Sequence, residues 1–205
     1  MREPIKSSLC KLFLAYHEVF IAVTSSGKIL HEIEKQASKR WLPIIGYKKA
    51  QIIADVVEEK KPHCSLEVGA NVGYSAIVIA SHMPVDSYLI TIEVNRDLAI
   101  EAEANIKKAG LSDRVQVLSG DALKLIPEIK SPIDFAFLDA EKDEYIRYLE
   151  LMEPKLISGS VVVADNVGAF PRAMAEYLER VRHSGLYESQ YVSVGWDGIE
   201  VSRRL

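Results

Sequence analysis

The sequence predicts an α/β fold: a Rossmann-like, doubly wound, mostly parallel sheet of seven strands that ends in an antiparallel hairpin. From residue 63 onward, short apolar runs rich in β-branched residues alternate with amphipathic segments of helical period. The first of these runs leads through a glycine-containing turn straight into a helical segment. The last two runs have only the turn Gly195-Trp196-Asp197-Gly198 between them, so they should pair antiparallel.

The alternating part consists of five strand–helix units and then the two hairpin strands. Strands are predicted over residues 64–68, 87–93, 114–119, 133–138, 158–164, 187–194 and 197–203. Helices are predicted over residues 73–82, 96–109, 121–129, 142–153 and 170–183. Such alternation is typical of parallel strands with helices on both faces of the sheet.

Three further helices are predicted before the first strand, over residues 8–24, 28–40 and 47–60. Ser25-Ser26-Gly27 should break the first from the second, and Pro43 and Gly46 mark a loop before the third. We interpret the chain as a single domain, residues 1–205, with an N-terminal helical extension (1–43) and a core (44–205). The apolar stripes of the extension predict packing on the core or, as the alternative, a twofold interface in a homodimer.

The composition is that of an ordinary globular protein: 205 residues, 48% hydrophobic, 26% charged, with a formal net charge of −4. This charge argues against a broad nucleic-acid-binding surface. A local basic patch stays open as an alternative to solvated helix faces, and its members would be Lys35, Lys39, Arg40, Lys48 and Lys49.

Cysteine usage and the N-terminal segment predict a cytoplasmic protein with no membrane partner. Cys10 and Cys64 are the only cysteines, as expected for free thiols in a reducing compartment. The apolar segment 9–23 is interrupted by charged residues and is too short to span a bilayer, so an amphipathic helix is the better interpretation.

The turn after the first strand has the pattern Glu67-x-Gly69-x-x-x-Gly73, followed by Ser75 in the first turn of a helix. Glycine allows a ligand to approach the backbone closely, and the helix N-terminus offers unpaired N–H groups to an anionic group such as a carboxylate. This is a nucleotide-type cofactor loop, with a plain strand–turn–helix joint as the alternative. The dinucleotide pattern G-x-G-x-x-G is not met, since Asn71 stands at its second glycine.

Polar residues follow each predicted strand, at the edge where open α/β sheets bind their ligands. Glu93 ends the second strand and could accept hydrogen bonds from ribose hydroxyls, or else cap a helix. Asp121, in Gly120-Asp121-Ala122, could cap the next helix or lie at the edge of an adenine ring.

The ends of the fourth and fifth strands predict a metal site. Asp139, Asp165 and Asn166 should meet there, and two carboxylates with an amide oxygen suit octahedral Mg²⁺. A zinc site is disfavoured because no histidine or thiol is among them. Lys142, one turn after Asp139, is a candidate general base. The alternative is a surface lysine following an aspartate that caps a helix.

Together these residues resemble the metal-dependent O-methyltransferases, the class I S-adenosylmethionine enzymes related to catechol and caffeoyl-CoA O-methyltransferases. The resemblance runs from about residue 44 to the end of the chain. It is carried by the glycine loop, Glu93, Gly120-Asp121-Ala122, Phe137-Leu138-Asp139-x-x-Lys142 and Ala164-Asp165-Asn166. The last two segments are specific, whereas the glycine loop is shared with all class I methyltransferases.

The resemblance implies S-adenosylmethionine and Mg²⁺ as cofactors and assigns a role to each matching residue. Cofactor binding falls to Ile45, Gly46, Glu67, Gly69, Gly73, Ser75, Glu93, Asp121, Ala122 and Asp139. Glu67 and Gly69 would line the methionine part, Ser75 would hold its carboxylate, and Glu93 would bind the ribose. Asp139, Asp165 and Asn166 would bind Mg²⁺, with Asp139 and Lys142 as the catalytic residues.

The sequence departs from the catechol enzymes at three places. Ala140 and Glu141 stand where those enzymes have bulky His and Trp side chains. Tyr191 stands near the place of a glutamate that holds the second catechol hydroxyl. The chain also runs from Asn166 almost directly into the predicted helix 170–183, without a longer substrate loop.

The expected reaction is Mg²⁺-dependent methyl transfer to a hydroxyl of a small catechol-like or vicinal-hydroxyl acceptor. The alternative within the same chemistry is methylation of a hydroxylated tRNA base of the hydroxyuridine type. Two further alternatives are an NAD-dependent oxidoreductase, disfavoured by the missing glycine, and a cofactor-binding scaffold without catalysis.

Overall fold

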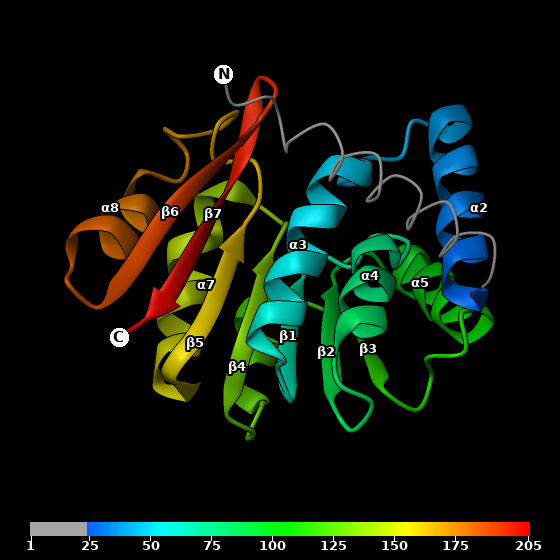
Figure 1. The fold of residues 1–205 in the computed structure, drawn as a ribbon, viewed down its shortest axis with the longest axis horizontal. Coiled ribbons are helices and arrows are strands. Elements are labelled where there is room, and N and C mark those ends of the chain that lie inside the picture. Colours follow the sequence, from blue (N-terminus) through cyan, green and yellow to red (C-terminus); the bar gives the residue numbers. More distant parts are fainter. Residues whose placement is uncertain (1–23) are drawn as a thin grey trace, which may run out of the picture.

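The computed structural model describes residues 24–205, which fold around one seven-stranded sheet with helices on both faces (Figure 1). The strand order is β3-β2-β1-β4-β5-β7-β6. The strands are β1 Cys64–Val68, β2 Tyr88–Glu93, β3 Val115–Ser119, β4 Ile133–Leu138, β5 Leu156–Ala164, β6 Tyr187–Val194 and β7 Asp197–Arg204. The first five are parallel, whereas β7 pairs antiparallel with both β5 and β6. The predicted fold is therefore confirmed, terminal hairpin included.

The sheet is apolar on both faces because side chains along a strand alternate between them. In β4, Phe135 and Phe137 pack into one core, whereas Ala136 and Leu138 pack into the other. Helices α2 Ser25–Arg40, α3 Gly46–Lys60, α4 Tyr74–His82 and α5 Arg96–Lys108 cover the first face. Helices α6 Ala122–Leu125, α7 Tyr145–Met152 and α8 Ala175–His183 cover the second.

Among the N-terminal helices, the boundary of α2 differs from the prediction. Ser25-Ser26-Gly27, predicted as the break before a helix that starts at residue 28, instead form the first turn of α2. Thr24 has an extended backbone, and its hydroxyl accepts a hydrogen bond from the Gly27 amide at 3.0 Å, which makes Thr24 the N-cap. Apart from Thr24, the predicted helix 8–24 lies outside the described residues.

Three later helices are shorter than predicted. The segment 121–129 is α-helical only to Leu125 and then forms a 3₁₀ turn, Ile126–Glu128, whose Pro127 lacks the N–H needed to continue the helix. The segment 142–153 begins with a 3₁₀ turn, Lys142–Glu144. The predicted helix 170–183 begins only at Ala175, because the preceding loop is bonded to β7 through Val167 N and Gly198 O at 3.2 Å.

The topology places one residue of the hairpin at the ligand-binding edge of the sheet. Strands β1 to β5 all have their carboxyl ends at the same edge, whereas antiparallel β7 starts there. Asp197, the first residue of β7, therefore lies beside the end of β5, with Asp165 and Asn166.

Candidate active site

A cavity of about 460 Å³ opens at the carboxyl ends of the parallel strands. It is lined by the loop before α3, the glycine loop after β1, and the residues that follow β2 to β5. The site residues predicted from sequence that line it are Ile45, Gly69, Ser75, Glu93, Asp121, Ala122, Asp139, Lys142, Asp165 and Asn166. Gly46, Glu67 and Gly73 are not among the lining residues.

The glycine loop passes close to the end of β4. Gly69 has a φ of +102°, and a Cβ at this position would overlap the carbonyl group of Asp139. Gly73, with a φ of +86°, precedes the first turn of α4, where no side chain caps the helix. Tyr74 and Ser75 of this turn line the cavity, and the first N–H groups of a helix have no partner within it, as an anion-binding helix N-terminus requires.

Glu93 is held in place by the backbone on both sides. Its carboxylate accepts hydrogen bonds from the amides of Asn71 at 2.7 Å and Asn95 at 2.9 Å. Asn71 also donates from its side chain to Pro43 O at 2.6 Å, which links the glycine loop to the loop before α3. Each carboxylate oxygen has a second lone pair, so Glu93 can still accept from a ligand in the cavity.

Asp121 caps the short helix α6, since its carboxylate accepts from the Leu123 amide at 2.9 Å. Both Asp121 and Ala122 also line the cavity. The two alternatives for this segment, capping and contact with a ligand, are therefore compatible.

Glu67 lies behind the lining residues, with a fully buried side chain. Thr91 donates a hydrogen bond to Glu67 Oε2 at 2.5 Å, whereas Oε1 has no hydrogen-bond partner. Burial raises the pKa of Glu67 to about 7, although hydrogen bonds from Ser75 and Thr91 oppose the shift. The role of Glu67 at the methionine part of a cofactor stays a prediction.

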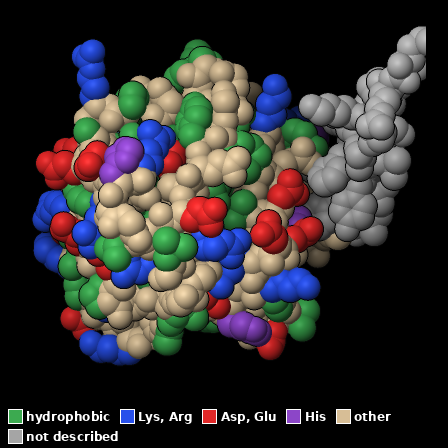
Figure 2. Space-filling view, turned by 60° about the vertical axis from the view of Figure 1, so that its left-hand side comes forward, with side chains coloured by type: hydrophobic (Ala, Val, Ile, Leu, Met, Phe, Trp, Pro, Cys, Tyr) green, Lys and Arg blue, Asp and Glu red, His purple; other side chains and the backbone are tan. Residues whose placement is uncertain are grey.

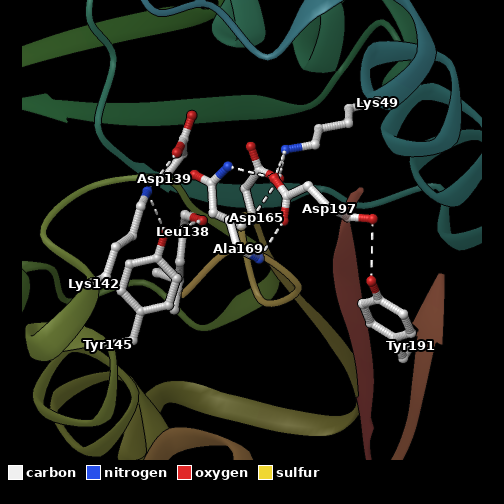
Figure 3. Close-up of polar contacts among 10 residues, drawn as sticks. Lys49, Leu138, Asp139, Lys142, Tyr145, Asp165, Ala169, Tyr191 and Asp197 are labelled. Atoms are coloured by element: carbon white, nitrogen blue, oxygen red, sulfur yellow. Dashed lines mark hydrogen bonds and ion pairs between the residues drawn. The ribbon is translucent and has the colours of Figure 1, made fainter. Parts of the chain in front are cut away.

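Asp139 and Lys142 form an ion pair at the end of β4 (Figure 3). The ammonium of Lys142 lies 2.8 Å from Asp139 Oδ1 and donates to the hydroxyl oxygen of Tyr145 at 3.1 Å. The Tyr145 hydroxyl in turn donates to Leu138 O at 2.9 Å. Lys142 thus uses two of its three N–H groups on protein oxygens.

Asp165 and Asn166 at the end of β5 lie in a second network, centred on Lys49 (Figure 3). Lys49 Nζ lies 2.5 Å from Asp165 Oδ1 and 2.7 Å from Asp197 Oδ2. The Asn166 side chain donates to Asp197 Oδ2 at 2.7 Å, and the Ala169 amide donates to Asp197 Oδ1 at 2.8 Å. Asp165 is 2% and Asp197 4% exposed, so both carboxylates depend on these donors.

The electrostatics of this network differ between its two carboxyl groups. Burial, together with the negative charge of Asp139, raises the pKa of Asp165 to about 6, although Lys49 opposes the shift. For Asp197, burial is outweighed by the hydrogen bonds from Lys49, Asn166 and the backbone, which lower its pKa to about 2. Burial alone would lower the pKa of Lys49, but its two carboxylate partners raise it.

The residues predicted to bind Mg²⁺ have suitable donor atoms. Asp139 and Asp165 bond to their lysines through Oδ1, so the Oδ2 of each takes no part in these ion pairs. Asn166 bonds to Asp197 through its amide nitrogen, which leaves its amide oxygen as an acceptor. All three line one cavity, and the charge of Asp139 acts on Asp165. Two carboxylates and an amide oxygen fit a hard divalent cation.

Lys49 and Asp197 were not predicted as site residues. The sequence favours a solvated helix face for Lys49, with a basic surface patch as the alternative, but Lys49 is buried, so both interpretations are wrong for this residue. A signal was available: Lys49 stands four and eight residues before Ile53 and Val57, on the buried face of α3. For Asp197 the sequence predicts only a position in the turn and at the start of the last strand. Tyr191 lies outside the cavity, with its hydroxyl donating to Asp197 O at 3.1 Å.

Within residues 24–205, three or more His, Cys, Asp or Glu side chains nowhere cluster in a way that could hold a metal. No helix in the same range has the length and apolar character needed to cross a bilayer.

The chain is similar in sequence to known proteins. Residues 21–184 match the family model described as O-methyltransferase. The catechol O-methyltransferase of Sus scrofa is 39% identical over 156 residues, which cover 73% of this chain and 83% of that protein. The catechol O-methyltransferase of Bos taurus is 37% identical over 162 residues, which cover 76% of this chain but only 59% of the relative.

Solved structures share the fold. The O-methyltransferase from Bacillus cereus in complex with SAH superimposes with a TM-score of 0.80 at 24% identity, over 87% of this chain and 91% of that one. The O-methyltransferase TomG from Streptomyces achromogenes, in complex with SAM, gives 0.78 at 23% identity, over 86% and 89%. The match to the family model and the identity to the catechol enzymes show that this chain belongs to the O-methyltransferase family.

Proposed function

We propose that this protein transfers a methyl group from S-adenosylmethionine to a hydroxyl of a small catechol-like or vicinal-hydroxyl acceptor, with Mg²⁺ as a second cofactor. One observation carries the proposal. Asp139, Asp165 and Asn166 line the same cavity as the glycine loop and Glu93, with Lys142 2.8 Å from Asp139. Sulfonium donor, divalent cation and proton acceptor would thus share one site.

The cofactor would occupy the part of the cavity between the glycine loop and β3. Glu93 would accept from the ribose hydroxyls while its backbone bonds hold it in position. Ser75 and the N–H groups at the start of α4 would bind the carboxylate of the methionine part, and Asp121 and Ala122 would border the adenine. Gly69 and Gly73 would allow the backbone of this loop to pass close to the cofactor, and the backbone near Ile45 and Gly46 would help to hold the carboxylate.

S-adenosylmethionine would supply an activated methyl group, and Mg²⁺ would lower the pKa of the acceptor hydroxyl. The chain's own contribution is to hold and align. Asp139, Asp165 and Asn166 would fix the cation beside the cofactor, which aligns the acceptor oxygen with the methyl carbon. Asp139 and Tyr145 hold Nζ of Lys142 in position. Once this ammonium has released one proton to solvent, its neutral amine would take the proton of the acceptor hydroxyl.

The acceptor class is proposed from the names of the relatives and from the metal site. The relatives with 37–39% identity are catechol O-methyltransferases. The chain spans about 60% of the length of the first two such relatives. Two adjacent oxygens on the acceptor would chelate the cation and present one oxygen to the methyl group.

A methyl-transfer assay with radiolabelled S-adenosylmethionine tests the proposal. The acceptors are a catechol, a hydroxycinnamoyl thioester and bulk tRNA, each with Mg²⁺ and with excess chelator. We expect labelling of the catechol that chelator abolishes and that Asp139→Ala reduces more than about 100-fold, with S-adenosylhomocysteine binding retained. Activity that is unchanged in chelator, or in the variant, would contradict the metal-assisted scheme.

The tRNA arm of that assay decides between the two acceptor classes. Figure 2 shows Lys and Arg side chains interleaved with Asp and Glu over the described residues of the face in view, which does not favour a long polyanion there. Labelling of tRNA with steep salt dependence and no labelling of catechol would replace the small acceptor with an RNA base.

We also propose a cytoplasmic homodimer. The support is the presence of only two cysteines, of which Cys64 is a free thiol, and the apolar stripe of the N-terminal helices. Light scattering of the purified protein at micromolar concentration should give twice the mass of the chain, and the mass of one chain would contradict the dimer.

A further inference from the structure

The carboxylate of Asp197 fixes which way the amide of Asn166 points. Asp197 Oδ2 accepts from Asn166 Nδ2 at 2.7 Å, so the amide oxygen is turned away from Asp197. The opposite amide orientation would place an oxygen against a carboxylate, with no proton between them. Asn166 also has a φ of +62°, a conformation that Asn tolerates better than most residues. The loop 165–169 is thus held to the start of β7.

Asp197 is itself held from two directions. Ala169 N donates to its Oδ1 at 2.8 Å, and Lys49 Nζ reaches its Oδ2 from α3 at 2.7 Å (Figure 3). The same ammonium lies 2.5 Å from Asp165 Oδ1. Lys49 therefore links Asp165, which is proposed to bind the cation, to Asp197, which orients the second proposed ligand, Asn166.

We infer that Lys49 and Asp197 form a positioning pair for the proposed metal site, in which Lys49 holds Asp165 and Asp197 holds Asn166. The inference rests on the proposed function, because it concerns the cation that Asp139, Asp165 and Asn166 would bind. It assigns a role to two residues outside the predicted site: Lys49, which lines the cavity from α3, and Asp197, which is not among the lining residues.

Charge alone makes the opposite prediction for Lys49, which allows the pair to be tested. A positive charge beside Asp165 repels a cation, so its removal should tighten Mg²⁺ binding if the ligands stay in place. If Lys49 positions those ligands, its removal should weaken binding in spite of the lost repulsion. Partners that orient metal ligands typically contribute about 10–100-fold to metal affinity.

The experiment is calorimetric titration of the full-length protein with Mg²⁺, with and without S-adenosylhomocysteine and in the absence of acceptor. The variants are Lys49→Met, Asp197→Asn and the double variant. Lys48→Met is the matched control, since it removes the same charge from an exposed position next to Lys49 on α3. Circular dichroism and S-adenosylhomocysteine affinity report whether each variant is folded.

The double variant decides the question even if Lys49→Met fails to fold. It has the net charge of the wild type, because the lost positive charge of Lys49 is balanced by the lost negative charge of Asp197. Asp165 is therefore not left beside a second buried carboxylate that lacks its partner. Charge alone gives it wild-type affinity for Mg²⁺, whereas positioning predicts an affinity at least about 10-fold weaker. Lys49→Met should be weakened to a similar extent and Lys48→Met unchanged.

The failures of the two proposals are distinguishable. A wild-type protein that binds Mg²⁺, together with a double variant or a Lys49→Met variant of equal or higher affinity, overturns the positioning pair only. A wild-type protein that binds no Mg²⁺ under either condition overturns the proposed metal site and the positioning pair with it.

Discussion

Lys142 Nζ lies 2.8 Å from Asp139 Oδ1, one helical turn away along the chain and inside the same cavity. This pair joins a proposed metal ligand to the proposed base. The lysine side chain is 20% exposed and the aspartate 23%, so solvent and acceptor can both reach it.

Replacement of Lys142 by Met should lower kcat by about 10²–10⁴-fold, because no base would then take the proton of the substrate hydroxyl. Mg²⁺ affinity should be equal to or higher than that of the wild type, since a positive charge that repels the cation is removed beside Asp139. Steady-state kinetics and calorimetry measure the two quantities. Lys124→Met is the control. Lys124 also pairs with an aspartate three residues before it, Asp121, but its side chain is exposed. More than a tenth of wild-type kcat in Lys142→Met would rule out a role as base.

Replacement of Glu93 by Ala should weaken S-adenosylhomocysteine binding by about 10-fold or more. The variant loses the acceptor for ribose and also the contacts with the amides of Asn71 and Asn95 that hold the glycine loop. Calorimetry measures the affinity. Glu103→Ala, on the outer side of α5, is a matched control and should bind normally. Equal affinities in the two variants would remove Glu93 from the cofactor site.

Glu67 should make stability depend on pH in a defined direction. Its pKa is raised from 4.5 to about 7 by burial, so between these values the unfolded chain loses this proton while the folded protein keeps it. The contribution of Glu67 to stability is therefore full below about pH 4.5 and is lost as the pH rises toward 7. A shift of this size corresponds to about 3 kcal/mol.

The variant Glu67→Gln isolates this effect, because its side chain resembles the protonated carboxyl group at every pH. Urea unfolding should give similar free energies for wild type and variant near pH 4.5, and a more stable variant near pH 8. A difference that does not change with pH, or that changes in the other direction, would contradict the raised pKa.

Gly69 and Gly110 both have positive φ, but only Gly69 is crowded. A Cβ at position 69 would overlap the carbonyl of Asp139, whereas nothing lies within 4 Å of one at position 110. Gly69→Ala should therefore lower the free energy of unfolding by at least about 3 kcal/mol and displace the end of β4. Gly110→Ala should lose only about 1–2 kcal/mol, the cost of the backbone conformation. Urea unfolding compares them, and equal losses would show that the contact with Asp139 is unimportant.

The sequence by itself determined the order of strands and helices and the residues at the strand ends. Apolar runs alternate along the chain with amphipathic helical segments, because each strand is buried on both faces and each helix on one. This pattern is local, so each segment can be assigned from its own residues. Asp139, Asp165 and Asn166 were predictable because parallel strands end at one edge of the sheet. Boundaries were less predictable: α2 begins at Ser25 because the hydroxyl of Thr24 caps it, and α8 begins late because the preceding loop bonds to β7 instead.

Only the tertiary structure decided what surrounds those strand ends. Lys49 comes from α3, before the sheet begins, and Asp197 from its last strand, 148 residues further along the chain, yet their side chains lie 2.7 Å apart. From sequence, a lysine in a helix is predicted to be a solvated side chain, and an aspartate beside glycine is predicted to lie in a turn. The buried pair exists because antiparallel β7 starts where the parallel strands end, and a charge removed from water requires a partner that sequence neighbours do not supply.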